Sequence, residues 1–181
     1  MGRYFETYYN KITYPIDSVE SRGLRNAQLG AIHAIASFFT INKKDAAIVI
    51  MPTGSGKTAV LMLVPYLIRK KRVLVVTSSK MVRGQISEDF LNLRTLCVAN
   101  VFNTSMKKPK VFEMEHLYTK EMHKSLEQAD VIVVTPSCAL SLSESDWAKK
   151  NIDLVEVDEA HHTPAKTWQQ ILVNLSTSTH V

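Results

Sequence analysis

The sequence lacks the features that would place it in a membrane or in a disulfide-stabilised secreted class. Its 181 residues include two cysteines, Cys97 and Cys138, in apolar contexts, where free buried thiols are the default, although the sequence leaves a disulfide open. The apolar stretch 59–68 is too short to span a bilayer and contains Pro65. The first six residues are polar and aromatic, unlike a signal peptide. We therefore expect a cytoplasmic protein with no membrane partner.

The sequence also lacks internal repeats, low-complexity tracts and linkers. Hydrophobic residues make up 45% and charged residues 22%, which suits one globular domain with a core. The basic excess is mild, with a net charge of +5. Binding to a polyanion is one interpretation, and solubilised helix ends and loops are the other. The basic residues cluster in the segments 43–44, 69–72, 107–110 and 149–150.

A glycine-rich loop follows directly after a predicted buried strand, residues 46–51. Residues 52–58 read Pro-Thr-Gly-Ser-Gly-Lys-Thr, and their glycines permit a tight turn whose backbone N–H groups can hold phosphates. Lys57 can reach the β and γ phosphates of a nucleotide, and the Thr58 hydroxyl can ligate Mg²⁺. Met51 replaces the first glycine of the full phosphate-loop pattern, so an ordinary glycine-rich turn is the alternative. The predicted nucleotide-binding residues of the loop are Thr53, Gly54, Ser55, Gly56, Lys57 and Thr58.

A second motif follows the predicted strand 152–157. Asp158 and Glu159 come directly after this strand, and ligands bind at the carboxyl ends of strands in open α/β sheets. Asp158 is predicted to hold Mg²⁺, and Glu159 to orient and deprotonate an attacking water. Such an acidic pair alone is usually a solvated turn, but the upstream loop favours a catalytic set of Lys57, Asp158 and Glu159. Glu156, inside the strand, must be paired, edge-exposed or protonated.

Taken together, the loop and the sequence Asp-Glu-Ala-His at 158–161 resemble the first motor domain of superfamily 2 helicases and translocases. Residues 157–162 are similar to the motor subunits of type I and type III restriction enzymes. The resemblance implies a three-layer, RecA-like α/β P-loop NTPase fold with a mostly parallel sheet. It implies ATP and Mg²⁺ as cofactors and nucleic acid as partner, DNA rather than RNA. It assigns His161 a role in coupling nucleotide binding to nucleic acid.

Three weaker motifs occur in the order that this family has. Residues 24–28 resemble the adenine-reading motif, with Gln28 on the base edge and Arg25 beside it, although Gln28 could simply be exposed on a helix. Residues 75–85 and 131–137 resemble two segments that touch the nucleic-acid backbone. Thr135 with Pro136 could equally be only a helix start. The predicted nucleic-acid contacts are Ser79, Lys80, Arg83, Thr135 and Ser137.

Hydrophobic periodicity predicts the elements around these motifs. Helices are expected over 26–39, 57–69, 80–91, 113–128, 136–142 and 164–175, and strands over 46–51, 73–77, 96–99, 131–135 and 152–157. Near-continuous apolar strands alternating with helices predict a parallel sheet covered on both faces. Residues 1–22 are a lead-in segment, and residues 23–181 are the motor domain.

The family resemblance also indicates parts that these residues do not supply. In the family, a further strand lies between the loop strand and the strand before the acidic pair, and a second RecA-like domain contributes an arginine finger. We expect the isolated chain to bind ATP–Mg²⁺ with weak or absent hydrolysis, because loss of such a finger costs about 10³–10⁵ in rate. A non-hydrolysing nucleotide- or DNA-binding module and a P-loop kinase are the alternatives. ATP turnover stimulated by polynucleotide distinguishes the motor from both.

Overall fold

A five-stranded parallel sheet forms the centre of the protein. The structure is a computed structural model that describes residues 4–41, 45–160 and 165–181. The sheet order is β2-β3-β1-β4-β5, and every pair is parallel. Every residue of β1 and β3 is buried, which confirms the predicted parallel sheet with two covered faces. The strands are β1 (Val73–Val76), β2 (Val111–Glu113), β3 (Val131–Val134), β4 (Leu154–Val157) and β5 (Thr179–His180).

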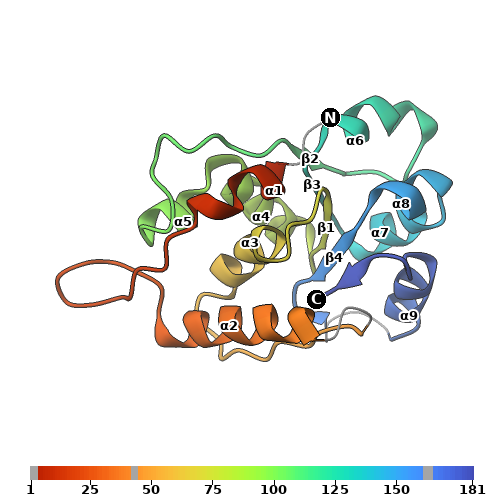
Figure 1. Ribbon diagram of the computed structural model, residues 1–181. Coiled ribbons are helices and arrows are strands. Elements are labelled where there is room, and N and C mark those ends of the chain that lie inside the picture. The colour runs from red at the N-terminus through yellow and green to blue at the C-terminus, as the bar shows by residue number, and fades with distance from the viewer. Residues whose placement is uncertain (1–3, 42–44, 161–164) are drawn as a thin grey trace.

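Helices cover the sheet in two layers, and the strand residues alternate between them (Figure 1). Val73 and Val75 pack into the first layer, whereas Leu74 and Val76 pack into the second. The first layer contains α1 (Tyr4–Tyr8), α2 (Asn26–Ile41), α3 (Lys57–Leu67), α4 (Lys80–Asn92) and α5 (Arg94–Val98). The second contains α6 (His123–Gln128), α7 (Pro136–Ser143), α8 (Asp146–Asn151) and α9 (Ala165–Asn174). Two short 3-10 helices complete the helical elements: η1 (Tyr9–Lys11) follows α1, and η2 (Lys120–Met122) precedes α6.

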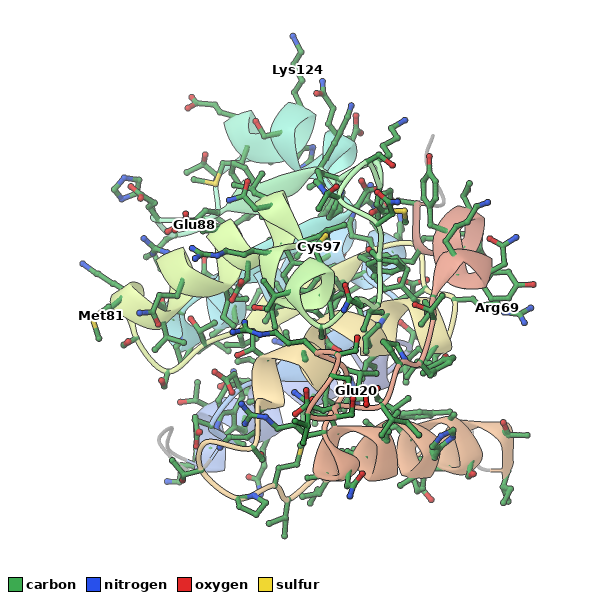
Figure 2. All side chains as sticks on the ribbon, turned by 90° about the vertical axis from the view of Figure 1, so that its left-hand side faces the viewer. Glu20, Arg69, Met81, Glu88, Cys97 and Lys124 are labelled. Carbon is green, nitrogen blue, oxygen red and sulfur yellow. The ribbon has the colours of Figure 1, made fainter. Side chains whose placement is uncertain are left out.

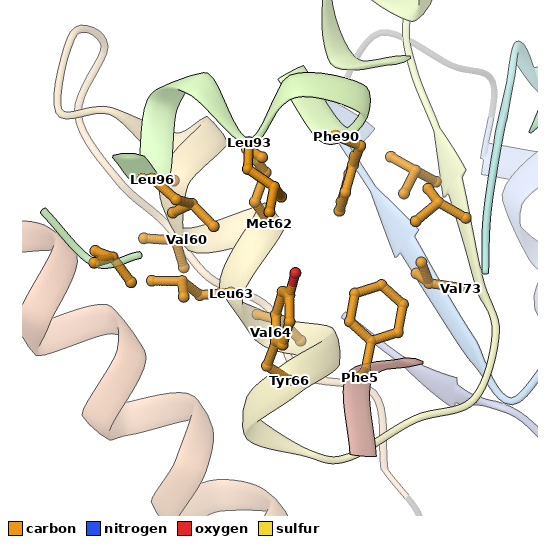
Figure 3. Close-up of a cluster of buried hydrophobic side chains, with 14 of the residues drawn as sticks. Phe5, Val60, Met62, Leu63, Val64, Tyr66, Val73, Phe90, Leu93 and Leu96 are labelled. Carbon is orange, nitrogen blue, oxygen red and sulfur yellow. The ribbon is translucent and has the colours of Figure 1, made fainter. Parts of the chain in front are cut away.

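The lead-in segment contributes to the core through α1. Phe5 is fully buried and lies edge-on to Tyr66 of α3, with ring centroids 4.7 Å apart (Figure 3). The Tyr66 hydroxyl donates a hydrogen bond of 3.1 Å to the Tyr4 hydroxyl. Aromatic burial of this kind packs α1 against α3, the helix that follows the glycine-rich loop.

Residues 46–51 are not the buried strand that the sequence predicted. Among the described residues their one backbone hydrogen bond runs from the Ala47 N–H to the His180 carbonyl, at 3.0 Å. Ile48 and Ile50 are 87% and 92% exposed. A strand needs a continuous partner, and β5 offers two residues. β5 itself lies between Ala47 and β4. It occupies the position between the loop segment and the strand before the acidic pair, where we expected these residues to supply no strand.

Two other predicted elements were wrong. Residues 96–99 belong to a helical segment, because Leu93 adopts φ +52° and starts α5 directly after α4. A four-residue apolar run cannot by itself distinguish a strand from a buried helical turn. Residues 113–128 are not one helix: the first of them ends β2, and the segment becomes helical only from η2 onward. Of the described helices, none is long and apolar enough to cross a membrane.

Candidate functional site

The glycine-rich loop is held in a tight turn by two left-handed glycines. Gly54 has φ +78° and Gly56 has φ +83°, a region that residues with a Cβ rarely adopt. The Ser55 N–H donates to the Pro52 carbonyl at 3.2 Å, and its hydroxyl donates to the same oxygen at 2.6 Å. Gly56 is the N-cap of α3, so Lys57 and Thr58 lie in the first turn of that helix. The backbone N–H groups of this turn are available to an anion.

The start of α2 and the residue before it are bonded to the loop. The Arg25 guanidinium donates to the Gly54 carbonyl at 2.5 Å, and the Gln28 amide nitrogen donates to the Gly56 carbonyl at 3.0 Å. The Gln28 amide oxygen accepts the Arg25 N–H at 2.8 Å. Gln28 is only 6% exposed, so it is not the solvated helix residue of the alternative interpretation. Both side chains therefore support the loop, whatever they contact in a nucleotide.

Gly56→Ala should destabilise the protein more than Gly54→Ala. Both substitutions put a Cβ on a left-handed residue, which costs about 1–2 kcal/mol. A Cβ at position 56 would also overlap the buried Gln28 amide, whereas a Cβ at position 54 meets nothing within 4 Å. Displacing Gln28 sacrifices its two hydrogen bonds, a further cost of about 1–3 kcal/mol. Urea unfolding measures the difference. In a Gln28→Ala background it should shrink; a difference of unchanged size would contradict the explanation.

The acidic pair lies at the carboxyl end of β4, opposite the loop. The Lys57 amine and the Glu159 carboxylate form an ion pair of 2.5 Å across 102 positions of sequence. The Asp158 N–H donates to the Val76 carbonyl at 2.9 Å, which extends the β4 ladder up to the acidic pair. Burial and the neighbouring Glu159 charge raise the pKa of Asp158, and the Lys57 charge opposes this. His161 lies outside the described residues.

A cavity of about 850 Å³ opens between the loop and β4. Its polar wall holds Thr53, Lys57, Asp158 and Glu159, and residues 46–51 form much of its apolar wall. Glu156 also lines it, 2% exposed, and neither of its carboxylate oxygens has a hydrogen-bond partner among the described residues. Burial raises the pKa of Glu156 well above its ordinary value. Of the three states expected for this carboxyl group, the structure favours protonation.

The family of this chain is clear from a match over most of its length. The family described as type III restriction enzyme, res subunit, matches residues 21–181. The chain belongs to this family. A comparison with the curated proteins found no match.

Solved structures agree on the fold of this res-subunit chain. The UvsW helicase from bacteriophage T4 is 15% identical, with a TM-score of 0.65 over 97% of this chain and 56% of that chain. A DEAD box protein from the hyperthermophile Methanococcus jannaschii is 19% identical, with a TM-score of 0.58 over 90% of this chain and 48% of that one. The chain therefore spans about half the length of the solved chains it matches, and it is a superfamily 2, RecA-like motor domain of the helicase type.

Two segments that resemble backbone contacts lie at the same edge of this res-subunit domain as the acidic pair. Ser79 follows β1 and caps α4, accepting the Val82 N–H at 3.3 Å, and Lys80 beside it is exposed. Thr135 and Ser137 follow β3, and their hydroxyls lie 3.5 Å apart. Because β1 lies between β3 and β4, the three carboxyl ends are adjacent. Thr135 is the N-cap residue of α7 and Pro136 is its first residue, as the helix-start alternative predicted, although the Thr135 side chain makes no capping hydrogen bond.

Arg83 does not lie with the exposed polar residues at that edge. It is 5% exposed, and its guanidinium pairs with Glu113 at 2.8 Å and with Glu115 at 3.4 Å. It also donates to the Met114 carbonyl at 3.4 Å. The sequence identified both Arg83 and Lys80 from their place beside a segment that resembles a nucleic-acid contact, but the ion pairs with the end of β2 decided which of the two cations is buried. Arg83 thus holds α4 to β2, and Lys80 is the cation left at the surface.

Arg83→Met should therefore reduce stability rather than selectively weaken nucleic-acid binding. The substitution keeps the apolar stem but leaves Glu113 without its partner, at a cost of roughly 1–3 kcal/mol after allowing for the partial exposure of that carboxylate. Lys80→Gln is the matched control, and as an exposed change it should alter stability by less than about 0.5 kcal/mol. Thermal unfolding of both variants tests this. Equal melting temperatures would contradict the structural role.

Proposed function

We propose that this chain is the ATP-binding half of a nucleic-acid-dependent ATPase, a DNA helicase or translocase of the restriction or repair type. The observation that carries the proposal is the 2.5 Å contact between Lys57 and Glu159 at the mouth of a cavity walled by the glycine-rich loop. A phosphate-binding cation and a carboxylate base thus face one space large enough for a nucleotide. Cavities of about 300–1,000 Å³ are the usual size of small-molecule sites.

The loop and the residues around it each have a chemical role in this proposal. The backbone N–H groups at the start of α3 and the Lys57 amine would hold the β and γ phosphates. Arg25 and Gln28, which are bonded to the Gly54 and Gly56 carbonyls, would meet the nucleoside end, as the family resemblance implies. Glu159 would orient a water in line with the γ phosphate and accept its proton.

The oxygen donors near Lys57 fit Mg²⁺. Thr58 offers a hydroxyl and Asp158 a carboxylate, and hard divalent cations prefer oxygen ligands. Asp158 is also partly buried beside the negative Glu159, a setting in which a divalent cation relieves the repulsion between the two carboxylates. Mg²⁺ would neutralise charge on the phosphates during transfer.

The nucleic-acid partner would contact the carboxyl edge of the sheet. Ser79, Lys80, Thr135 and Ser137 would bind its backbone there, and His161 would couple this contact to the nucleotide. DNA is preferred over RNA because of the restriction-enzyme family. A second RecA-like domain, or a partner chain, would supply the arginine finger. Arg83 is left out of this interface because its charge is already paired.

ATP turnover with and without DNA tests the proposal. A protein that carries this chain together with its second motor domain should hydrolyse ATP faster when DNA is added, and Lys57→Ala should abolish the stimulated rate. The 181-residue chain alone should be slower by about 10³–10⁵, which is the usual loss when the arginine finger of a second domain is not supplied. ATP–Mg²⁺ binding with no turnover in the longer protein would favour the alternative, a non-hydrolysing nucleotide- and DNA-binding module. Stimulation by RNA but not DNA would contradict the partner.

A further inference from the structure

A row of exposed basic residues lies at the amino edge of the sheet, away from the candidate nucleotide site. The connections that enter β2, β1 and β4 each carry cations, and the connection that enters β3 lies between the first two in the sheet order. Six of these side chains are exposed: Arg69, Lys71, Lys107, Lys110, Lys149 and Lys150. We name this set the amino-edge row. In Figure 2, Arg69 before β1 and Met81 after β1 lie on opposite sides of the molecule.

Arg72 fastens the connections of the row together. Its guanidinium donates to the carbonyls of Ala129, Asn151 and Glu127, at 2.9, 3.2 and 2.9 Å. These three oxygens belong to the connections that enter β3 and β4. The connection that enters β2 is fastened separately, because the Tyr4 hydroxyl donates to the Lys107 carbonyl at 2.6 Å. The backbone that carries the six exposed cations is therefore held in place.

The carboxylates in these connections offset only part of the positive charge of the row. Asp153 accepts the N–H groups of Lys71 and Arg72 at 3.0 and 2.9 Å, and Asp130 accepts the Lys110 N–H at 2.8 Å. Both carboxylates thus bind backbone N–H groups, and the charges of Lys107 and Lys110 also act on Asp130, where they oppose the increase of its pKa by burial. Glu127 is the one exposed carboxylate in the segments 69–72, 107–110, 127–130 and 149–153, against six exposed cations. Within the described residues no ion pair joins any of these six to a carboxylate.

The shape of the row suits a linear polyanion. The three cation-bearing connections enter β2, β1 and β4, which together with β3 are four adjacent strands. Strands are about 4.8 Å apart, so the row extends over roughly 15 Å. Exposed Lys and Arg that neutralise successive phosphates are the usual means of sequence-independent nucleic-acid binding. We propose that the amino-edge row binds the phosphate backbone of a nucleic acid. This goes beyond the function proposed above, because the contacts at residues 79–80 and 135–137 lie at the opposite edge of the sheet.

The test is the salt dependence of DNA binding. Binding of a fluorescein-labelled duplex to the 181-residue chain is followed by anisotropy between 50 and 200 mM salt, for the wild type and for Lys107→Gln/Lys110→Gln. The slope of log K against log salt should fall by about 2 in magnitude, because each of the two lysines would neutralise one phosphate. Lys149→Gln/Lys150→Gln, at the other end of the row, should have the same effect. Neither pair removes the backbone hydrogen bonds of these connections, so circular dichroism should be unchanged.

Three controls make the result decisive. Arg94→Gln removes an exposed charge on α5, outside the row, and should leave the slope unchanged. An unchanged slope in both lysine pairs would overturn the proposal, and if Lys80→Gln still weakened binding the function proposed above would stand without it. Poly-glutamate is the third control: if it bound as tightly as DNA with the same dependence on Lys107 and Lys110, the row would be a site for acidic protein and the nucleic-acid assignment would be wrong.

Discussion

Lys57→Ala and Glu159→Gln should change ATP–Mg²⁺ binding in opposite directions. The Lys57 amine would donate to phosphate oxygens, and a charge-assisted hydrogen bond of that kind is worth about 1.5–3 kcal/mol, or roughly 10- to 150-fold in affinity. In the structure the same amine is held by Glu159 at 2.5 Å. A phosphate must compete with that carboxylate, so Glu159→Gln should tighten binding. The gain is at most about fivefold, because both side chains are about one-third exposed and such pairs contribute at most about 1 kcal/mol.

Isothermal titration of both variants with ATP–Mg²⁺ measures these effects. Equal weakening by the two substitutions would mean that Glu159 helps to hold the nucleotide, and its role as a base would have to be given up. The double variant provides a further check, since the benefit of Glu159→Gln depends on releasing Lys57. In a Lys57→Ala background that benefit should vanish.

Glu156→Leu should stabilise the protein at neutral pH, although the residue lies beside the candidate site. The carboxyl group is 2% exposed, and it has no hydrogen-bond partner among the described residues. An unsatisfied buried polar group costs about 1–3 kcal/mol, and an apolar replacement of similar volume removes that cost. The free energy of unfolding should therefore increase by a similar amount in urea. Glu88→Leu, at an exposed position, is the matched control and should change it by less than about 0.5 kcal/mol.

The pH dependence of stability tests the same carboxyl group without removing its shape. Burial raises the pKa of Glu156 in the folded state, so the folded state holds this proton to higher pH than the unfolded chain does. The stability that Glu156 contributes is thus complete below the unfolded pKa of about 4.3 and is lost as pH rises toward the folded pKa. The loss is about 1.4 kcal/mol per pH unit in that window.

Glu156→Gln should therefore gain stability over the wild type progressively as pH rises above about 5. Chemical unfolding at several pH values measures the difference between the two proteins, which cancels the titration of the other groups. Parallel stability curves for wild type and variant would show that the carboxyl group is ionised in the folded protein and has found a partner.

The sequence predicted the parts of the site that depend on local pattern. Gly54 and Gly56 have the positive φ that a phosphate loop requires, and Lys57 begins a helix. The apolar periods of β1, β3 and β4 were sufficient to place Asp158 at the end of a buried strand. In each case the physical cause lies within a few residues, because backbone freedom and side-chain alternation are local properties.

The elements that sequence reasoning missed depend on distant partners. Residues 46–51 are as apolar as β1, yet they form no strand, since a strand is stabilised by its neighbours rather than by its own composition. The turn that separates α4 from α5 depends on the left-handed conformation of Leu93. Leucine rarely adopts that conformation, so the sequence does not predict the turn.

The sequence by itself determined the elements of the candidate site: a glycine-rich loop, a carboxylate pair, and a parallel sheet with two covered faces. Tertiary structure decided how the charged groups are placed and paired. It buried Arg83 between two glutamates and left Lys80 exposed, joined Lys57 to Glu159 across 102 positions, and enclosed Glu156 without a hydrogen-bond partner among the described residues. The physical reason is that charge and desolvation depend on neighbours in space. Only packing brings those neighbours together, and the distance between two residues in the sequence does not predict whether they will be in contact.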